Sequence, residues 1–344
     1  MPNARASRPT RRGILAAGSA LGLGAALAAC GQGKDEKKPS GADAAGKSGP
    51  WQFKDDRGQT SKSEARPKNI VAFTGAAAAL HDYGIEVKGV FGPTRAKDGK
   101  PDVQAGDLDI DKVEIIGNVW GEFNMEKYAK LTPDLLVTDM WEKDDAWYVP
   151  PQSKDKIFKL AQSTVLLWAA QISMPGALQR RADLAESLGA DMKSKKVTDA
   201  KARFEKAAAR LRQAAKSKPE IRVMIGSASQ EEFYVSLAKM SADTRYFQEL
   251  GVTFVEPKVD AQGFFEKLSW ETVDKYKADI IMMDNRSSAL QPSALTAKPT
   301  WTRLPAVKAG QVVPRVTEPI YSYDKCATLV EDLAKAIENA KKVA

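Results

Sequence analysis

The stretches NMEKYAKLTPD (124–134) and SWETVDKYKAD (269–279) follow the same plan in the two halves of the chain. Each opens on a favourable helix N-cap, Asn or Ser, and each has a glutamate, Glu126 or Glu271, eight residues before its closing aspartate. An acid near its N-terminus stabilises a helix, which explains either glutamate singly. It does not explain the equivalent placement, so the repeat predicts two similar lobes with an acidic residue at each tip.

Around this repeat, short β-branched runs alternate with amphipathic stretches, an order that predicts an α/β fold. Roughly 290 residues follow Gly49, more than one hydrophobic core usually serves, so we expect two lobes. Helices are expected at 75–83 and 125–131, and a long helical region at 175–216 is interrupted near Gly189. Strands are expected at 69–73, 87–91, 113–116, 135–138 and 163–168, then at 221–225, 232–235, 252–255, 280–283 and 312–313.

The N-terminus carries an export signal. A basic segment with four arginines precedes an apolar stretch, 14–29, that ends in Leu-Ala-Ala-Cys30. This is typical of a bacterial lipoprotein signal peptide, 1–29, whose removal leaves lipid on Cys30 and the chain outside the membrane. A transmembrane anchor is the alternative, but spanning a bilayer takes about twenty strongly apolar residues. We expect a flexible tether, 30–50, and a protein anchored by lipid to the outer face of the cell membrane.

Composition argues against nucleic acid as a partner. Removal of the four signal arginines lowers the formal net charge from +8 to +4, and no basic stripe stands out among the mixed Lys and Glu. Lipidation of Cys30 leaves Cys326 alone, so the mature chain forms no intramolecular disulfide and its stability has to come from the core. A buried, inert thiol is favoured for Cys326 over a nucleophile.

Several motifs together resemble one family. They are DDRG (55–58), PKNIVA (67–72), IGNV (116–119), MEK (125–127), LTPD (131–134) and WTRLPAVKAG (301–310). In this order and spacing, the chain from about residue 51 to residue 343 resembles the helix-bridged solute-binding proteins of ABC importers for iron siderophores, haem and cobalamin.

The resemblance implies two Rossmann-like α/β lobes joined by a long backbone α-helix, with the ligand cleft between the lobes. Approximate bounds are 51–173 for the N-terminal lobe, 174–190 for the bridging helix and 191–344 for the C-terminal lobe. In the family, an acidic residue on each lobe meets arginines of the membrane permease. By position these roles fall on Glu126 and Glu271, and a helix-braced clamp is expected to close only slightly on binding.

The ligand is expected to be large and amphipathic. A single histidine, His81, occurs in the chain and lies in an expected helix, so direct binding of zinc or manganese is not favoured. The loops after the expected strands are rich in aromatic side chains, which select shape without charge. For each aromatic residue taken singly, packing in the core is the alternative to contact with a ligand. This alternative is favoured for Trp270 and Trp301. The candidate ligand-binding residues are Arg95, Trp120, Trp141, Trp147, Tyr148, Trp168, Phe233, Tyr234, Arg286, Tyr321 and Tyr323.

The charges favour a hydroxamate siderophore over a catecholate. A trianionic catecholate complex needs a concentrated basic pocket, whereas a ferric hydroxamate, already neutralised, needs few donors. The sequence offers only a few candidate arginines, Arg95 and Arg286 with Arg315 less certain, and so few cations suit a ferric hydroxamate. Glu142, Asp144 and Asp145 would tolerate the pendant ammonium group of a ferrioxamine-like ligand, or they form a solvated acidic loop. Iron would enter wrapped in the siderophore, so we expect no metal site and no cofactor.

Other function classes remain as alternatives. Haem or cobalamin would suit the same transporter class, and Tyr148, Tyr321 or Tyr323 could serve as an axial haem ligand. An extracytoplasmic hydrolase is not favoured, because the nucleophile-like turn GSAS (226–229) has only His81 as a partner, far away in the first lobe. A passive surface protein would need neither the matched glutamates nor the aromatic set. We predict a monomeric, non-enzymatic substrate-binding lipoprotein that delivers a ferric siderophore to an ABC permease.

Overall fold

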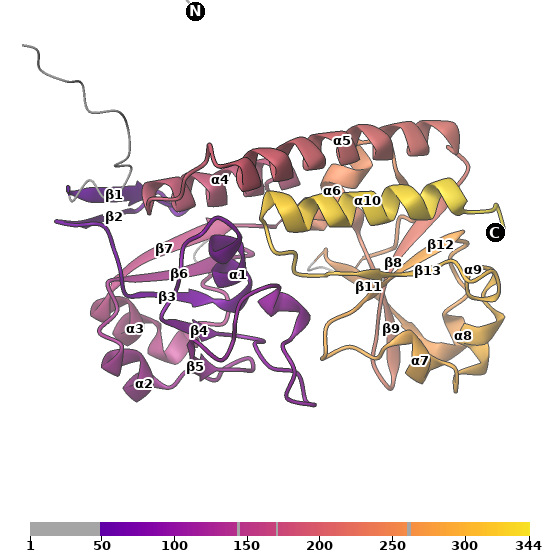
Figure 1. Ribbon diagram of the computed structural model, residues 1–344. Helices are drawn as coiled ribbons and strands as arrows, with labels where there is room; N and C mark the ends of the chain where they lie inside the picture. The colour runs from indigo at the N-terminus through magenta and orange to yellow at the C-terminus, as the bar shows by residue number, and fades with distance from the viewer. Residues whose placement is uncertain (1–48, 143–144, 170, 260–262) are drawn as a thin grey trace, which may run out of the picture. The chain divides into compact units, whose positions relative to one another are not determined.

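The described chain contains two large β-sheets whose strands are connected largely by helices (Figure 1). The computed structural model describes residues 49–142, 145–169, 171–259 and 263–344, and all of these belong to one compact unit, Gly46–Ala344. One sheet is built from the N-terminal half of this unit and the other from the C-terminal half. The predicted fold class, two α/β lobes, is confirmed.

The sheet of the N-terminal lobe is parallel throughout. Its elements are β3 (Ile70–Phe73), α1 (Thr74–Asp82), β4 (Gly89–Phe91), η1 (Val103–Ala105), β5 (Glu114–Gly117), α2 (Met125–Lys130), β6 (Leu135–Met140), η2 (Pro151–Ser153), α3 (Lys154–Leu160) and β7 (Gln162–Leu167). The strand order is β5-β4-β3-β6-β7. Strands β3 and β6 are buried along their whole length, which is why their sequences are largely continuous apolar runs.

The sheet of the C-terminal lobe is mixed. Its elements are β8 (Arg222–Ala228), β9 (Glu232–Ser236), η3 (Ala238–Met240), α6 (Ala242–Glu249), β10 (Thr253–Phe254), β11 (Phe265–Ser269), η4 (Trp270–Thr272), β12 (Ile280–Asp284), α7 (Pro292–Leu295), α8 (Pro299–Arg303), α9 (Pro305–Lys308) and β13 (Val312–Arg315). The strand order is β11-β9-β8-β12-β13, and β10 pairs with β8. Strand β9 runs antiparallel to both β8 and β11. Strand β11 was not predicted, because this edge strand (FEKLS) carries little of the apolar pattern that marks a buried strand.

The helical region expected at 175–216 forms two helices, α4 (Met174–Ser187) and α5 (Lys195–Ser217). Gly189 lies between them with φ +102°, a left-handed conformation that ends the first helix. Helix α5 is the long connecting helix, and it lies beside the C-terminal helix α10 (Tyr323–Asn339) in Figure 1. Ion pairs from Arg203 to Glu331 and from Arg210 to Glu338 join α5 to α10. The predicted bounds of the lobes, and of a bridging helix at 174–190 that coincides with α4 rather than α5, stay a prediction.

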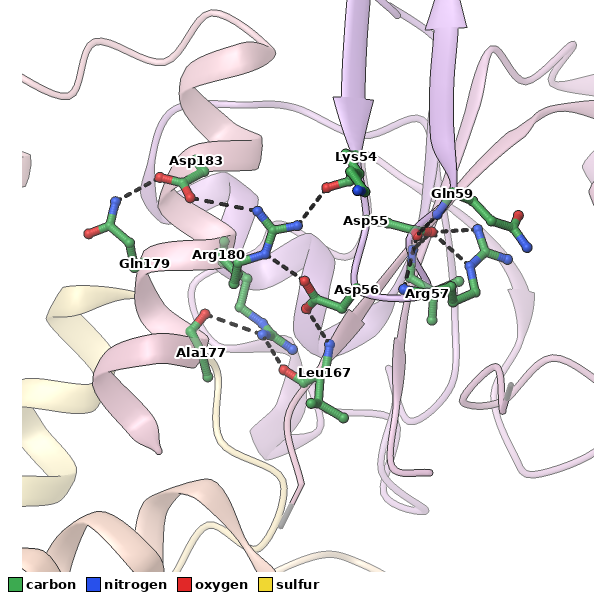
Figure 2. A network of polar contacts seen from close by, with 12 residues as sticks. Lys54, Asp55, Asp56, Arg57, Gln59, Leu167, Ala177, Gln179, Arg180 and Asp183 are labelled. Atoms are coloured by element: carbon green, nitrogen blue, oxygen red, sulfur yellow. Dashed lines mark hydrogen bonds and ion pairs between the residues drawn. The ribbon is translucent and has the colours of Figure 1, made fainter. Parts of the chain in front are cut away.

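A short hairpin is fixed to the N-terminal sheet by two adjacent aspartates (Figure 2). It comprises β1 (Trp51–Lys54) and β2 (Thr60–Ser63). The buried carboxylate of Asp55 accepts a hydrogen bond from the backbone N–H of Val165, at 3.1 Å. The carboxylate of Asp56 accepts from the backbone N–H of Leu167, at 2.8 Å, and from Arg180 of α4, at 2.6 Å. The DDRG motif therefore fixes the carboxyl end of β7, where the chain turns into the site described below.

The closing aspartates of the sequence repeat do the same structural work in both lobes. The carboxylate of Asp134 accepts a hydrogen bond from the N–H of Asn69, and its own N–H donates to the carbonyl of Asn69, both at 2.9 Å. Asp279 makes the same two contacts with Arg222, at 2.9 and 2.8 Å. Each aspartate thus ties the start of one parallel strand, β6 or β12, to the start of its neighbour, β3 or β8.

Replacing Asp279 with asparagine is expected to lower the free energy of unfolding at pH 7 by about 1–3 kcal/mol. Burial acts to raise the pKa of Asp279, but backbone N–H groups of Val343, Arg222 and Ala344 and the ammonium of Lys342 outweigh it and lower the pKa. Because the folded pKa lies below the unfolded one, this stability is present at neutral pH and is lost as the pH falls below about 4. Denaturant unfolding at pH 7 and pH 3 checks this, and an equal loss at both would contradict it.

Candidate functional site

A cleft of about 800 Å³ lies where strands of both lobes end. Strands β6, β7, β12 and β13 deliver Trp141, Trp168, Asp284 and Arg315 to it at or just beyond their carboxyl ends. Ligand sites in α/β proteins typically lie outside the carboxyl ends of the strands. The lining residues are Trp141, Glu142, Asp145, Trp147, Trp168, Gly226, Ser227, Tyr234, Ser236, Leu237, Met240, Ser241, Phe264, Phe265, Lys267, Asp284, Arg286, Arg315, Thr317 and Glu318.

One side of the cleft is a continuous set of aromatic rings, here called the aromatic wall. Its members are Trp120, Trp141, Trp147, Tyr148, Trp168 and Phe264. The ring centroids of Trp141 and Trp168 lie 4.6 Å apart, and those of Trp147 and Trp168 lie 5.7 Å apart, in edge-to-face contacts. Trp120 packs against Trp147 and is 58% exposed, and neither it nor Tyr148 is among the residues that line the cleft, so these two rings extend the wall beyond it.

Three of the predicted ligand contacts lie in the core instead, which corrects the expectation that they face the cleft. Phe233 and Tyr234 are adjacent on β9 and therefore point to opposite faces, so Tyr234 lines the cleft while Phe233 packs against Trp301. Tyr321 is buried, and its hydroxyl approaches the carbonyl of Trp168 at 3.4 Å. Tyr323 is buried in the first turn of α10. As expected, Trp270 and Trp301 are also buried.

Other candidates with reactive or charged groups lie away from the cleft. Arg95 forms an ion pair with Asp111 and donates to the carbonyl of Gly99 at 3.0 Å, so the expectation that it contacts a ligand in the cleft is wrong. His81 is half-buried in α1, as expected for a structural histidine. Cys326 is a free, fully buried thiol in α10, and burial raises its pKa. The prediction of a buried thiol is confirmed.

The two arginines that line the cleft are both paired with carboxylates. Arg286 donates to Asp284 at 2.7 Å and to Glu318 at 2.6 Å, and Arg315 donates to the buried Asp243 at 3.1 Å. Burial acts to raise the pKa of Asp284, but the hydrogen bond and the charge of Arg286 lower it overall. The arginines therefore contribute little uncompensated positive charge to the cleft.

Glu318 lines the cleft and was not among the residues predicted from the sequence. It is 5% exposed and lies between β13 and α10. Besides Arg286, it accepts hydrogen bonds from the side chains of two residues of the N-terminal lobe, Gln104 at 3.0 Å and Trp147 at 3.1 Å. One carboxylate thus joins both lobes and fixes the indole of Trp147. The only feature of the sequence that could have pointed to Glu318 is its position a few residues beyond the strand expected at 312–313.

Two polar atoms at the cleft have no hydrogen-bond partner among the described residues. They are the indole N–H of Trp168 and the hydroxyl of Thr317, and both atoms are buried. A buried donor without a partner costs about 1–3 kcal/mol, so a small rearrangement that brought an acceptor to either atom would be favourable.

The two repeat glutamates are exposed and do not line the cleft, Glu126 in the first turn of α2 and Glu271 in the short turn η4. Asn124 caps α2 as expected, accepting from the backbone N–H groups of Glu126 and Lys127 at 3.1 and 3.0 Å. The prediction of a matching helix cap at Ser269 is wrong. The chain passes from β11 directly into the short turn η4, and the Ser269 side chain accepts no hydrogen bond from the backbone there. Instead, a hydrogen bond from Ser269 lowers the pKa of the exposed Glu271 carboxyl.

Some predictions fall on residues outside the described ranges. These are the signal peptide, Cys30, most of the tether and Asp144. Within the described ranges, no helix has both the length and the apolar character needed to cross a bilayer. The same residues include no group of three or more His, Cys, Asp or Glu side chains arranged to hold a metal ion.

A cleft between two α/β lobes joined by a long helix defines a solute-binding protein, and the comparisons with known proteins agree. Residues 97–314 match the family of periplasmic binding proteins. The chain belongs to this family, and the resemblance found in its sequence is confirmed. A comparison with curated proteins found no match.

The chain is similar to several solved structures. DesE, a ferric-siderophore receptor protein from Streptomyces coelicolor, is 61% identical, with a TM-score of 0.83 over 86% of this chain and 100% of that one. The siderophore periplasmic binding protein from the fuscachelin gene cluster of Thermobifida fusca is 20% identical, with a TM-score of 0.57 over 80% and 97%. The petrobactin-binding protein YclQ from Bacillus subtilis is 17% identical, with a TM-score of 0.63 over 84% and 99%. The last two establish the fold alone.

Proposed function

We propose that the protein captures a ferric siderophore in the cleft and delivers it to the permease of an ABC importer. The observation that carries this is the aromatic wall along a cleft of about 800 Å³, a lining suited to a large amphipathic ligand. The 61% identity to DesE, a ferric-siderophore receptor, supports the same ligand class. Iron is cargo here, held by the siderophore, and no side chain of the protein has to coordinate it.

The siderophore is of the hydroxamate type, resembling ferrioxamine. A trianionic catecholate complex would need uncompensated cations, whereas Arg286 and Arg315 are already paired with carboxylates. A ferric hydroxamate has its iron charge neutralised by its own ligand groups and needs mainly hydrogen-bond donors and apolar surface. The N–H of Trp168 and the hydroxyl of Thr317 are donors of that kind, held by residues that line the cleft, and both atoms are buried in this structure.

The alternatives have less support. For haem, the tyrosines expected as axial ligands, Tyr148, Tyr321 and Tyr323, are not among the lining residues. For hydrolysis, Ser227 lines the cleft but donates to Asp284 at 2.9 Å, and His81 is not part of the lining. We propose that the protein acts as a binding component without catalysis and as a monomer, and cobalamin remains as a ligand for the test to examine.

The protein works outside the cytoplasm, held by lipid on Cys30 at the outer face of the cell membrane. Membership of the periplasmic binding protein family supports an extracytoplasmic location. The lipoprotein signal that ends at Cys30 supports the anchor.

Titration of tryptophan fluorescence tests the ligand. The full-length protein, purified in detergent, is titrated with ferrioxamine B, ferrichrome, a ferric catecholate, haem, cobalamin and free ferric ion. Saturable quenching by a hydroxamate complex, without a response to free iron, is the expected result because several tryptophans line the cleft. A response to haem or cobalamin alone would overturn the proposal of a hydroxamate ligand. No response to any of the compounds would overturn the proposed binding function.

Replacing Glu126 or Glu271 with alanine is expected to leave ligand affinity unchanged and to reduce uptake roughly tenfold, because each glutamate would lose its arginine partner on the permease. Both carboxylates are exposed, and neither lines the cleft. Uptake of iron-labelled siderophore is measured in cells that carry each variant in place of the wild-type gene. Glu205→Ala, at an exposed position of α5, is the matched control. If the variants lost affinity and uptake equally, the assignment of Glu126 and Glu271 to contact with the permease would be wrong.

A further inference from the structure

The cleft carries more negative than positive charge. Among the described lining residues, the acids are Glu142, Asp145, Asp284 and Glu318, and the bases are Lys267, Arg286 and Arg315. Arg315 is further offset by Asp243, which lies behind it at 3.1 Å. No carboxylate of the described residues forms an ion pair with Lys267, so its ammonium is the one lining cation without a carboxylate partner there.

The buried part of this excess negative charge can be traced to Glu318. Asp284 alone neutralises Arg286, since it accepts from both Nε and Nη2 of that guanidinium, at 3.1 and 2.7 Å. Glu318 is then a second carboxylate on the same guanidinium, through Nη1 at 2.6 Å. Its other two partners, Gln104 and Trp147, are neutral donors, which stabilise a carboxylate without cancelling its charge.

A buried carboxylate that shares its one counter-charge, Arg286, with a second carboxylate is incompletely neutralised, and its field acts on whatever fills the cavity beside it. A ligand with positive charge would lower that cost, and an anionic ligand would raise it. The half-buried Asp145 and the exposed Glu142 act in the same direction from the rim.

We propose that Glu318 determines the charge of the ligand, so that the cleft selects neutral or cationic ferric complexes and rejects anionic ones. This rests on the proposed siderophore function and deepens it. Lys267, on the exposed part of the lining, acts in the opposite direction and limits the preference. The selection is therefore electrostatic, and it acts on the periphery of the ligand as well as on its iron centre.

A ligand series with a constant iron centre tests the proposal. The iron complexes of desferrioxamine B, of its N-acetyl derivative and of its N-succinyl derivative share one hydroxamate core. Their net charges are +1, 0 and −1, in that order. The dissociation constants of all three are measured for the wild-type full-length protein, for Glu318→Gln and for Lys267→Gln. Glu205→Gln changes the net charge equally on the exposed face of α5 and is the control.

Wild-type protein is expected to bind in the order cationic, neutral, anionic. A unit charge about 12 Å away in a medium of effective dielectric constant about 20 changes a dissociation constant roughly tenfold. The cationic and anionic complexes differ by two unit charges, so Glu318→Gln should reduce the ratio of cationic to anionic affinity about 100-fold. Lys267→Gln should increase that ratio, and the control should leave it unchanged. These opposite signs exclude a merely structural effect, which would weaken all three ligands alike.

Each contrary outcome has its own meaning. If the wild type binds all three complexes equally, or if Lys267→Gln and Glu318→Gln change the ratio in the same direction, the charge selection is wrong while the siderophore function stands. If none of the three binds, the proposed function fails and the charge selection fails with it. Should Glu318→Gln fold poorly in a thermal unfolding control, the order of the three wild-type affinities and the effect of Lys267→Gln still decide whether the cleft selects its ligand by charge, and Glu318→Asp, which keeps the charge and should keep the wild-type order, then tests the carboxylate itself.

Discussion

Replacing Trp147 with alanine is expected to weaken siderophore binding about 100-fold, a loss of roughly 3 kcal/mol. The indole occupies the middle of the aromatic wall, with ring contacts to Trp120 at 5.0 Å, to Trp168 at 5.7 Å and to Tyr148 at 5.9 Å. Its N–H also donates to Glu318. Truncation therefore removes ligand-facing surface and lets the neighbouring rings move, while the core of each lobe stays intact.

Two further variants separate these contributions. Trp147→Phe keeps a ring but loses the N–H, so its affinity should fall by only about tenfold. Leu160→Ala, at an exposed apolar position of α3 outside the cleft, is the control and should bind like the wild type. Isothermal titration with a ferric hydroxamate measures all three. If Trp147→Ala bound as tightly as the control, the aromatic wall would not be the ligand surface.

The sheet positions were predictable because buried parallel strands leave a local signal. Strands such as β3, β6 and β12 are buried on both faces and so appear as short, largely apolar runs. The repeat was informative for a different reason. Its two aspartates, Asp134 and Asp279, make equivalent contacts at the starts of paired strands, so the same local chemistry recurs in each lobe.

The site was only partly predictable, because the loops after the strands show which residues are near the cleft but not which way they point. Trp141, Trp147, Trp168, Tyr234 and Arg286 line the cleft, as expected. Phe233, Tyr321 and Tyr323 have similar surroundings in the sequence and lie in the core. For Phe233, the distinction depends on which face of β9 meets the core, a property of the assembled sheet.

The pairing of charged residues could not be predicted from the sequence either, because it also depends on the assembled fold. Glu318 meets Arg286 from 32 positions away and Gln104 from 214 positions away. No spacing rule within one segment connects such residues. The sequence consequently suggested that the arginines would be available to a ligand, whereas the structure has them paired with carboxylates.

Replacing Arg181 with methionine is expected to lower the free energy of unfolding by about 3–5 kcal/mol, because it leaves a buried carboxylate without its partner. Arg181 and Asp139 form an ion pair at 2.7 Å with side chains only 4% and 8% exposed. The same guanidinium donates to the carbonyl of Leu167 at 2.9 Å and lies 4.7 Å from the centre of the Tyr321 ring. It therefore joins α4, the ends of β6 and β7, and the segment that leads into α10.

The pH dependence of that loss gives the sharper test. Burial raises the pKa of Asp139 and Arg181 opposes this, so removal of the arginine should raise the pKa further. A carboxyl whose folded pKa exceeds its unfolded pKa loses stability as the pH rises through the folded value, so the deficit should be larger at pH 7 than at pH 4.5. Guanidinium unfolding at both pH values measures it. Arg210→Met, which breaks the exposed pair with Glu338, should have little effect at either pH. A deficit in Arg181→Met that does not change with pH would mean that lost packing, rather than the unpaired Asp139, causes it.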